Sequence, residues 1–176
     1  IEPNEDWDHV AQNIPILKFP DGVTKENATY NGVDIKQADV NLLSYPLEII
    51  TDRSQIEKDL KYYEPRMSPQ GPAMGNSVLS TLHSKLGNSE KAYEVFIRSY
   101  KPNEVPPFGV LAETAGGTNP YFATGAGGML QAALFGFGGL RITDRGVEQW
   151  KTSLPKKWKS IQLKGIGPDK KDFDIR

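Results

Sequence analysis

The chain contains no cysteine and only two histidines among its 176 residues. Without cysteine there are no disulfide bonds and no thiolate metal ligands, so the sequence indicates no particular redox compartment. His9 and His83 lie far apart in the sequence, which argues against a histidine-rich metal site. We therefore expect neither a metal nor a cofactor.

Long apolar runs and an excess of one charge are also absent. No run approaches the ~20 residues of a membrane span. The 21 basic and 22 acidic residues give a net charge of -1, so nothing favours nucleic acid electrostatically. We expect no membrane and no nucleic-acid partner. At 176 residues, the chain fits one domain or a piece of a larger one.

Helical periodicity dominates what is present. A short helix is expected at residues 5–13, with Trp7 and Val10 facing inward, and another from about residue 34 to 44, ended by Pro46. Four further helices have clear apolar stripes: Ile56, Leu60 and Tyr63; Val78, Leu79, Leu82 and Leu86; Ala92, Val95, Phe96 and Tyr100; and Ala126, Met129, Leu130, Ala133, Leu134 and Phe137.

Polar residues and glycine mark the ends of these helices. Asp52 or Ser54 is the expected N-cap of the first, Gly87-Asn88 the C-cap of the second, and Ser89 the N-cap of the third. Because the turn at residues 86–89 is short, the two helices around it should be antiparallel neighbours. Residues 101–124 carry four prolines and no periodicity, and short alternating segments after residue 141 indicate strands.

Two polar stretches have the composition of a binding or catalytic site. Glu113 lies among apolar residues in a glycine-bounded segment, and a carboxylate in such surroundings is enriched among catalytic acids and bases. The alternative is an exposed loop glutamate or a buried salt-bridge partner. Lys36, Gln37 and Asp39 can donate and accept hydrogen bonds with sugar hydroxyls, or form a solvated helix end.

Two motifs connect these stretches to a known family. The segment "IKQADVNLLSYPL" resembles the Lys-Gln-Ala-Asp-Val segment of glycoside hydrolase family 65, which contains maltose and kojibiose phosphorylases and acid trehalases. About 80 residues downstream, "ETAGGTNPYFATGAGGMLQAALFGFGGLRI" is similar to a glycine-rich block of the acid trehalase-like members. The resemblance covers roughly residues 5–145.

The resemblance implies a fold and a division of roles. Residues 1–145 would be the C-terminal part of an (α/α)6-barrel catalytic domain, and residues 146–176 a small β-rich segment, within a mainly α chain. Lys36 and Gln37 would contact the glucosyl unit. Glu113 would be the general base of an inverting hydrolase, in which a second carboxyl group protonates the leaving oxygen.

The phosphorylases of the same family are the alternative. They hold phosphate with a His and a Ser, and alignment on Gly127-Gly128 places Phe122 and Gly125 at those positions. Neither side chain binds phosphate, so hydrolysis is favoured, although backbone amides at the start of the helix at Ala126 can still bind an anion. An alternative of another class is a non-catalytic carbohydrate-binding helical domain.

The family's general acid lies upstream of the Lys-Gln-Ala-Asp-Val segment, further than the 35 residues before Lys36 can accommodate. We therefore expect the chain to be the C-terminal part of a longer protein. Its expected partners are a disaccharide or glucoside substrate, the upstream part with its β domain and first half of the barrel, and a second copy in a homodimer. The localisation is left open, with a periplasmic or secreted protein slightly favoured.

Overall fold

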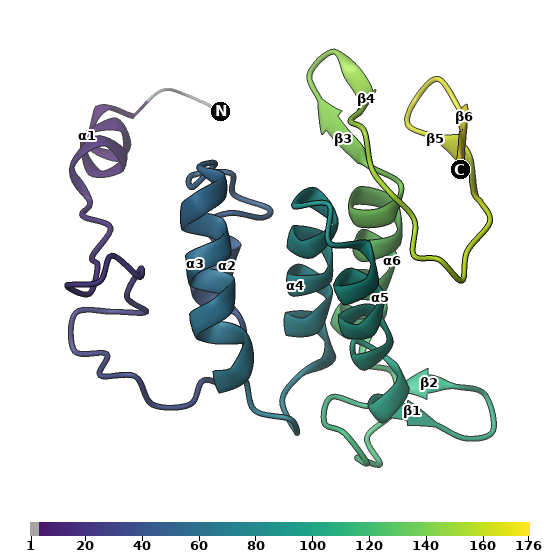
Figure 1. The fold of residues 1–176 in the computed structure, drawn as a ribbon, viewed down its shortest axis with the longest axis horizontal. Coiled ribbons are helices and arrows are strands. Elements are labelled where there is room, and N and C mark those ends of the chain that lie inside the picture. The colour runs from purple at the N-terminus through teal and green to yellow at the C-terminus, as the bar shows by residue number, and fades with distance from the viewer. Residues whose placement is uncertain (1–3) are drawn as a thin grey trace.

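The structure, a computed structural model, describes residues 4–176. Helices make up most of the chain as far as residue 137, with one small antiparallel hairpin between α5 and α6, and two further hairpins follow (Figure 1). Its helical segments are α1 (Glu5–Asn13), α2 (Asp39–Leu42), α3 (Arg53–Tyr63), η1 (Glu64–Arg66), α4 (Ala73–Lys85), α5 (Ser89–Arg98), η2 (Lys101–Asn103), α6 (Ala123–Gln131) and η3 (Ala132–Phe137). The expected mainly α class with small sheets is confirmed, and the closed barrel stays a prediction. Between residues 4 and 176 no helix is both long and apolar enough to cross a membrane.

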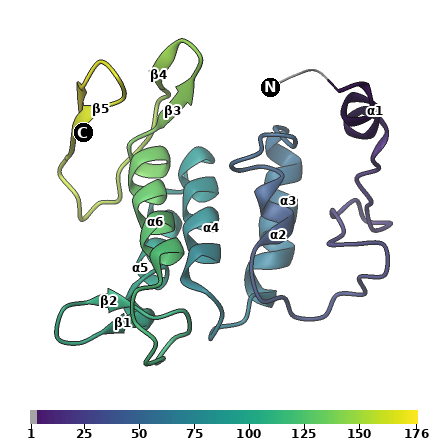
Figure 2. The same ribbon diagram turned by 180° about the vertical axis from the view of Figure 1, so that it is seen from behind.

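The first helix has the expected bounds but not the expected burial. The Asn4 side chain accepts hydrogen bonds from the N–H groups of Asp6 and Trp7, which fixes the start of α1. Trp7 is 64% exposed, Val10 is exposed as well, and α1 stands apart from the other helices (Figure 1, Figure 2). The expectation that these side chains face inward is therefore wrong for this chain, because no element within residues 4–176 packs over them.

The helix expected at residues 34–44 is reduced to the single turn of α2. Ile35 instead forms a parallel bridge with Met67: its N–H donates to the carbonyl of Arg66, and its carbonyl accepts from the N–H of Ser68. These two bonds hold residue 35 in an extended conformation, so Lys36 and Gln37 precede the helix rather than lie on it. Tertiary pairing has overridden the local helical pattern here.

The antiparallel pair α4 and α5 is confirmed. Leu79 and Leu82 of α4 and Ala92 and Val95 of α5 are buried. The hydroxyl of Ser80 donates to the carbonyl of Ala92 across the pair. Between the helices, Gly87 has φ +77°, a conformation that glycine adopts without steric strain. The expected N-cap Ser89 is instead the first residue of α5, and Asn88 holds the cap position without a side-chain hydrogen bond.

The α6–η3 helix packs closely on α4 through small residues. Figure 2 shows the two helices side by side. A Cβ atom at Gly128 would lie 2.9 Å from Ser77 Oγ, so only glycine allows this approach. The predicted apolar stripe of this helix is partly confirmed: Phe137 is buried as expected, but Leu130 is exposed, and Ala132, outside the stripe, is buried. The second half, η3, is a π-helical segment.

Three antiparallel hairpins complete the fold: β1 (Glu104–Val105) with β2 (Val110–Leu111), β3 (Leu140–Thr143) with β4 (Gly146–Gln149), and β5 (Ile161–Ile166) with β6 (Lys171–Ile175). The strands expected after residue 141 are thus confirmed. Trp158, between the last two hairpins, packs its ring 4.7 Å from the ring of Phe137. The division expected between residues 145 and 146 falls in the β3–β4 turn and stays a prediction.

A buried ionic network ties η1 to α4 and α5. Glu64 lies 2.9 Å from both His83 Nε2 and Lys91 Nζ, and 3.7 Å from Arg98. Burial opposes the ionisation of this carboxyl group, but hydrogen bonds and attraction from His83 and Lys91 outweigh it and lower the pKa of Glu64 to about 2. The network therefore joins three segments through one ionised carboxylate.

Candidate active site

Two residues that are distant in sequence meet in the structure. Lys36 Nζ lies 3.5 Å from Glu113 Oε1. Both side chains are accessible, with 67% of Lys36 and 42% of Glu113 exposed. The structure thus brings together two of the charged residues that the sequence singles out, as an open ion pair rather than a buried one.

Backbone packing against the start of α4 positions the lysine. A Cβ atom at Gly71 would lie 2.5 Å from the carbonyl oxygen of Lys36, and one at Gly75 would lie 3.6 Å from Gln37 Cα. Glycine at these two positions lets residues 36–38 lie directly against the N-terminal end of α4. Together with the Ile35–Met67 bridge, this contact fixes the backbone positions of Lys36 and Gln37.

A buried amide positions the glutamate. Asn103 Nδ2 donates to the carbonyls of Ala112 and Glu113, both at 3.0 Å, and the carbonyl of Asn103 accepts from the N–H of Ala112. The N–H of Phe122, just before α6, donates to the carbonyl of Leu111. Glu113 is therefore held between η2 and the start of α6. Sequence reasoning missed Asn103, because nothing local distinguishes it from an ordinary turn residue.

The remaining polar residues of the motif form a second contact. Gln37 Nε2 donates to Asp39 Oδ1 at 3.0 Å. The Asp39 carboxyl group also lies against that of Glu26, a half-buried residue of the preceding loop that the sequence analysis did not single out. Burial, and then hydrogen bonding and repulsion from Asp39, raise the pKa of Glu26 to about 7. The loop containing Glu26 has no periodicity that would have predicted this approach.

This arrangement has some of the groups that glycoside hydrolysis requires. Glu113 offers a carboxylate that can hold a water molecule and accept its proton, and Lys36 and Gln37 offer hydrogen-bonding groups for sugar hydroxyls. Within the described residues no group of three or more His, Asp or Glu side chains is arranged to hold a metal ion.

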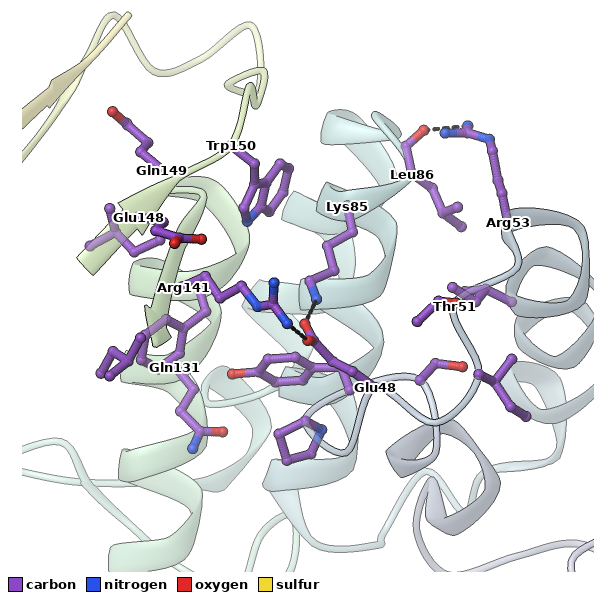
Figure 3. A pocket seen from close by; sticks show the side chains of 18 residues that line it. Glu48, Thr51, Arg53, Lys85, Leu86, Gln131, Arg141, Glu148, Gln149 and Trp150 are labelled. Atoms are coloured by element: carbon purple, nitrogen blue, oxygen red, sulfur yellow. Dashed lines mark hydrogen bonds and ion pairs between the residues drawn. The ribbon is translucent and has the colours of Figure 1, made fainter. Parts of the chain in front are cut away.

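A large cavity lies elsewhere. It has a volume of about 790 Å³ and opens beside the C-terminal end of α4 (Figure 3). Lys85 and Arg141 both pair with Glu48 inside it. These contacts, first of all the hydrogen bond from Lys85, hold the pKa of Glu48 below its usual value. Lys36, Gln37 and Glu113 do not line this cavity. The cavity is therefore separate from the residues with the relevant chemistry.

The comparisons with known proteins agree with the motif. The family described as glycosyl hydrolase family 65 central catalytic domain matches residues 6–103. The chain is 58% identical to a kojibiose hydrolase of Mucilaginibacter mallensis over 177 residues, covering 100% of this chain and 26% of that protein. A kojibiose hydrolase of Flavobacterium johnsoniae is 52% identical, over 98% of this chain and 26% of that protein.

A more distant relative has a different name. A periplasmic or secreted acid trehalase of Candida glabrata is 38% identical over 81% of this chain and 13% of its own length. The chain thus spans about a quarter of the kojibiose hydrolases and less of the trehalase. Since the family match covers more than half of the chain, the protein belongs to glycoside hydrolase family 65.

Proposed function

We propose that this chain supplies the general base and part of the sugar-binding site of an inverting α-glucoside hydrolase that acts on gluco-disaccharides. Glu113 is the base, and Lys36 and Gln37 bind the glucosyl unit. The observation that carries the proposal is the 3.5 Å contact between Lys36 and Glu113, beside the N-terminal ends of α4 and α6. The two family motifs meet there in space.

The open ion pair is suited to exchange partners. Because both side chains are largely solvated, separating them costs about 1 kcal/mol or less. A bound sugar then takes hydrogen bonds from the Lys36 ammonium. The Glu113 carboxylate holds a water molecule on the face of the sugar opposite the leaving group, and removes its proton as the glycosidic bond breaks.

An inverting hydrolase also needs a general acid, roughly 6.5–9.5 Å from the base to leave room for the water. We assign this acid to the upstream part of the protein, which also completes the (α/α)6 barrel. The exposed apolar residues Trp7, Val10, Leu47 and Ile49 support this assignment, because the upstream part would bury them.

Packing at Phe122 and Gly125 supports water over phosphate as the nucleophile. A Cβ atom at Gly125 would lie 2.8 Å from the ring of Phe122 and 3.4 Å from the Cβ of Ala73. A serine that could bind phosphate therefore does not fit at position 125 without displacing the ring. The aromatic residue and the glycine belong together, and neither contributes a phosphate ligand.

The names of the relatives guide the choice of substrate. The kojibiose hydrolases are the more similar proteins, so kojibiose is the first substrate to test and trehalose the second. By the same reasoning, the periplasmic or secreted trehalase supports a location outside the cytoplasm.

The test is product analysis with the full-length protein, in which this chain is joined to the upstream region that its relatives possess. Incubation with kojibiose or trehalose, with and without phosphate, should give glucose at a phosphate-independent rate. Early NMR spectra should show the β anomer of the attacked glucose. Phosphate-dependent release of a sugar 1-phosphate would instead identify a phosphorylase, and binding without turnover a carbohydrate-binding domain.

A further inference from the structure

Glu26 makes a contact that the proposed mechanism does not use. Its Oε2 atom is buried and has no hydrogen-bond partner among the described residues. The side chain that it contacts is the Asp39 carboxyl group, which is itself only an acceptor when ionised. Two ionised carboxylates in contact would leave a buried oxygen without a donor and two like charges side by side.

The other groups near Glu26 cannot supply the missing proton. The Tyr63 hydroxyl on α3 donates to the carbonyl of Thr24 at 2.6 Å, and the Tyr30 hydroxyl donates to the carbonyl of Val33 at 2.7 Å. Asp39 on α2, Tyr30 on the same loop and Tyr63 on α3 are the titratable groups that face Glu26. A proton held between the two carboxyl groups is therefore the arrangement that satisfies both.

The Asp39 carboxylate in turn fixes the side chain of Gln37. An amide can face a carboxylate only with its NH₂ group, and Gln37 Nε2 donates to Asp39 Oδ1 at 3.0 Å. The amide orientation is thereby set, and its carbonyl oxygen is available to accept a hydrogen bond from a sugar hydroxyl. Glu26, Asp39 and Gln37 form a chain of contacts that ends at the residue next to Lys36, which pairs with Glu113.

We propose that Glu26 is a positioning residue: as a neutral acid it donates to Asp39, and Asp39 holds the Gln37 amide in the orientation that binds the glucosyl unit. The inference rests on the proposed function, because it assigns the Gln37 side chain to sugar binding. It adds a residue outside both family motifs, and it makes sugar affinity depend on the protonation of a group that does not touch the sugar.

The protonation state of Glu26 sets the direction of the pH effect. Its pKa is raised to about 7, first by burial and then by Asp39. Below this pH the acid donates to Asp39, and the segment 36–39 is held in place. Above it, two adjacent carboxylates repel each other, and the Gln37 amide loses its fixed orientation. Affinity for the sugar should therefore fall as the pH rises through about 7.

The experiment measures kojibiose binding to the full-length protein carrying Glu113→Gln, which slows turnover and removes the charge of residue 113. Calorimetry should show affinity weakening about tenfold between about pH 5.5 and about pH 8.5. Adding Glu26→Gln, which keeps a neutral donor at every pH, should hold affinity at the low-pH value throughout. Glu26→Ala should bind weakly at every pH.

Two further variants make the result specific. Glu57→Gln removes an exposed glutamate that pairs with Arg53 on α3, and it should keep the parent pH profile. Asp39→Asn removes the facing charge and should give a flat profile even if Glu26→Gln fails to fold. A parent profile without pH dependence, or the same pH dependence in Glu26→Gln, overturns the inference. Absence of kojibiose binding together with absence of turnover in the wild type would instead overturn the proposed function.

Discussion

Two glutamates, Glu64 and Glu113, each pair with a lysine but occupy opposite kinds of surroundings. The Glu64 side chain is 14% exposed and contacts His83, Lys91 and Arg98 from two helices. The Glu113 side chain is 42% exposed and contacts one lysine that is itself mostly solvated. The first carboxylate is held by several partners that cannot leave without exposing a buried charge, whereas the second can exchange its partner for a ligand.

The difference separates stability from function. Removing one member of a buried ion pair leaves an uncompensated charge and is strongly destabilising. Removing one member of an exposed pair has little effect on folding. Glu64 should therefore matter to the fold and not to the chemistry, and Glu113 the reverse. Two variants test this comparison without changing Glu113, the proposed base.

The larger effect is expected for Glu64→Gln. This change leaves His83, Lys91 and Arg98 without their shared carboxylate, and should lower the free energy of unfolding by about 3 kcal/mol. Chemical denaturation of the full-length protein measures it. Turnover at temperatures where the variant is folded should stay unchanged. The matched control Glu57→Gln, which removes an exposed partner of Arg53, should shift stability by less than about 0.5 kcal/mol.

Glu64→Gln should also change how the stability of the protein depends on pH in the acidic range. Because the folded-state pKa of Glu64 is lowered from 4.5 to about 2, its stabilising contribution is complete above pH 4.5 and is lost as the pH falls toward 2. Wild-type stability should decline over that range more steeply than that of Glu64→Gln. Parallel declines in the two proteins would show that the network does not contribute in this way.

A smaller and purely functional effect is expected for Asn103→Ala. Its side chain holds the carbonyls of Ala112 and Glu113, so its loss should loosen the backbone that carries the proposed base. We expect kcat to fall about tenfold, with sugar affinity nearly unchanged, because Lys36 and Gln37 are held by other contacts. Steady-state kinetics and binding calorimetry separate the two quantities. Equal losses in kcat and affinity would mean that Asn103 supports the whole site.

The sequence predicts those parts of the fold that depend on local pattern. The stripe Ile56, Leu60 and Tyr63 correctly predicts α3, and Gly87 correctly predicts the end of α4. The helix expected at 34–44 is wrong because the bridge from Ile35 to Met67 is a tertiary contact. The burial expected for α1 is wrong. A periodic apolar face indicates that a helix can pack against another segment, but it does not identify that segment or place it within the chain.

Only some residues of the candidate site could be identified from the sequence. Family resemblance identifies Lys36, Gln37 and Glu113, and the structure brings Lys36 and Glu113 into contact. The roles of all three stay predictions. Glu26 and Asn103 are found only through the structure, because their importance lies in contacts with segments that are distant along the chain or adjacent only through a turn. Local composition does not contain that information.

Turnover of full-length Glu113→Ala, with and without azide, tests the central claim most directly. Without azide the rate should fall by about three powers of ten, because no group removes the proton from the attacking water. Azide is a small anionic nucleophile that needs no base, so it should restore turnover and give the β-glucosyl azide. Hydrolysis by Glu113→Ala within about twofold of the wild-type rate, without azide, would contradict the assignment of Glu113 as the general base.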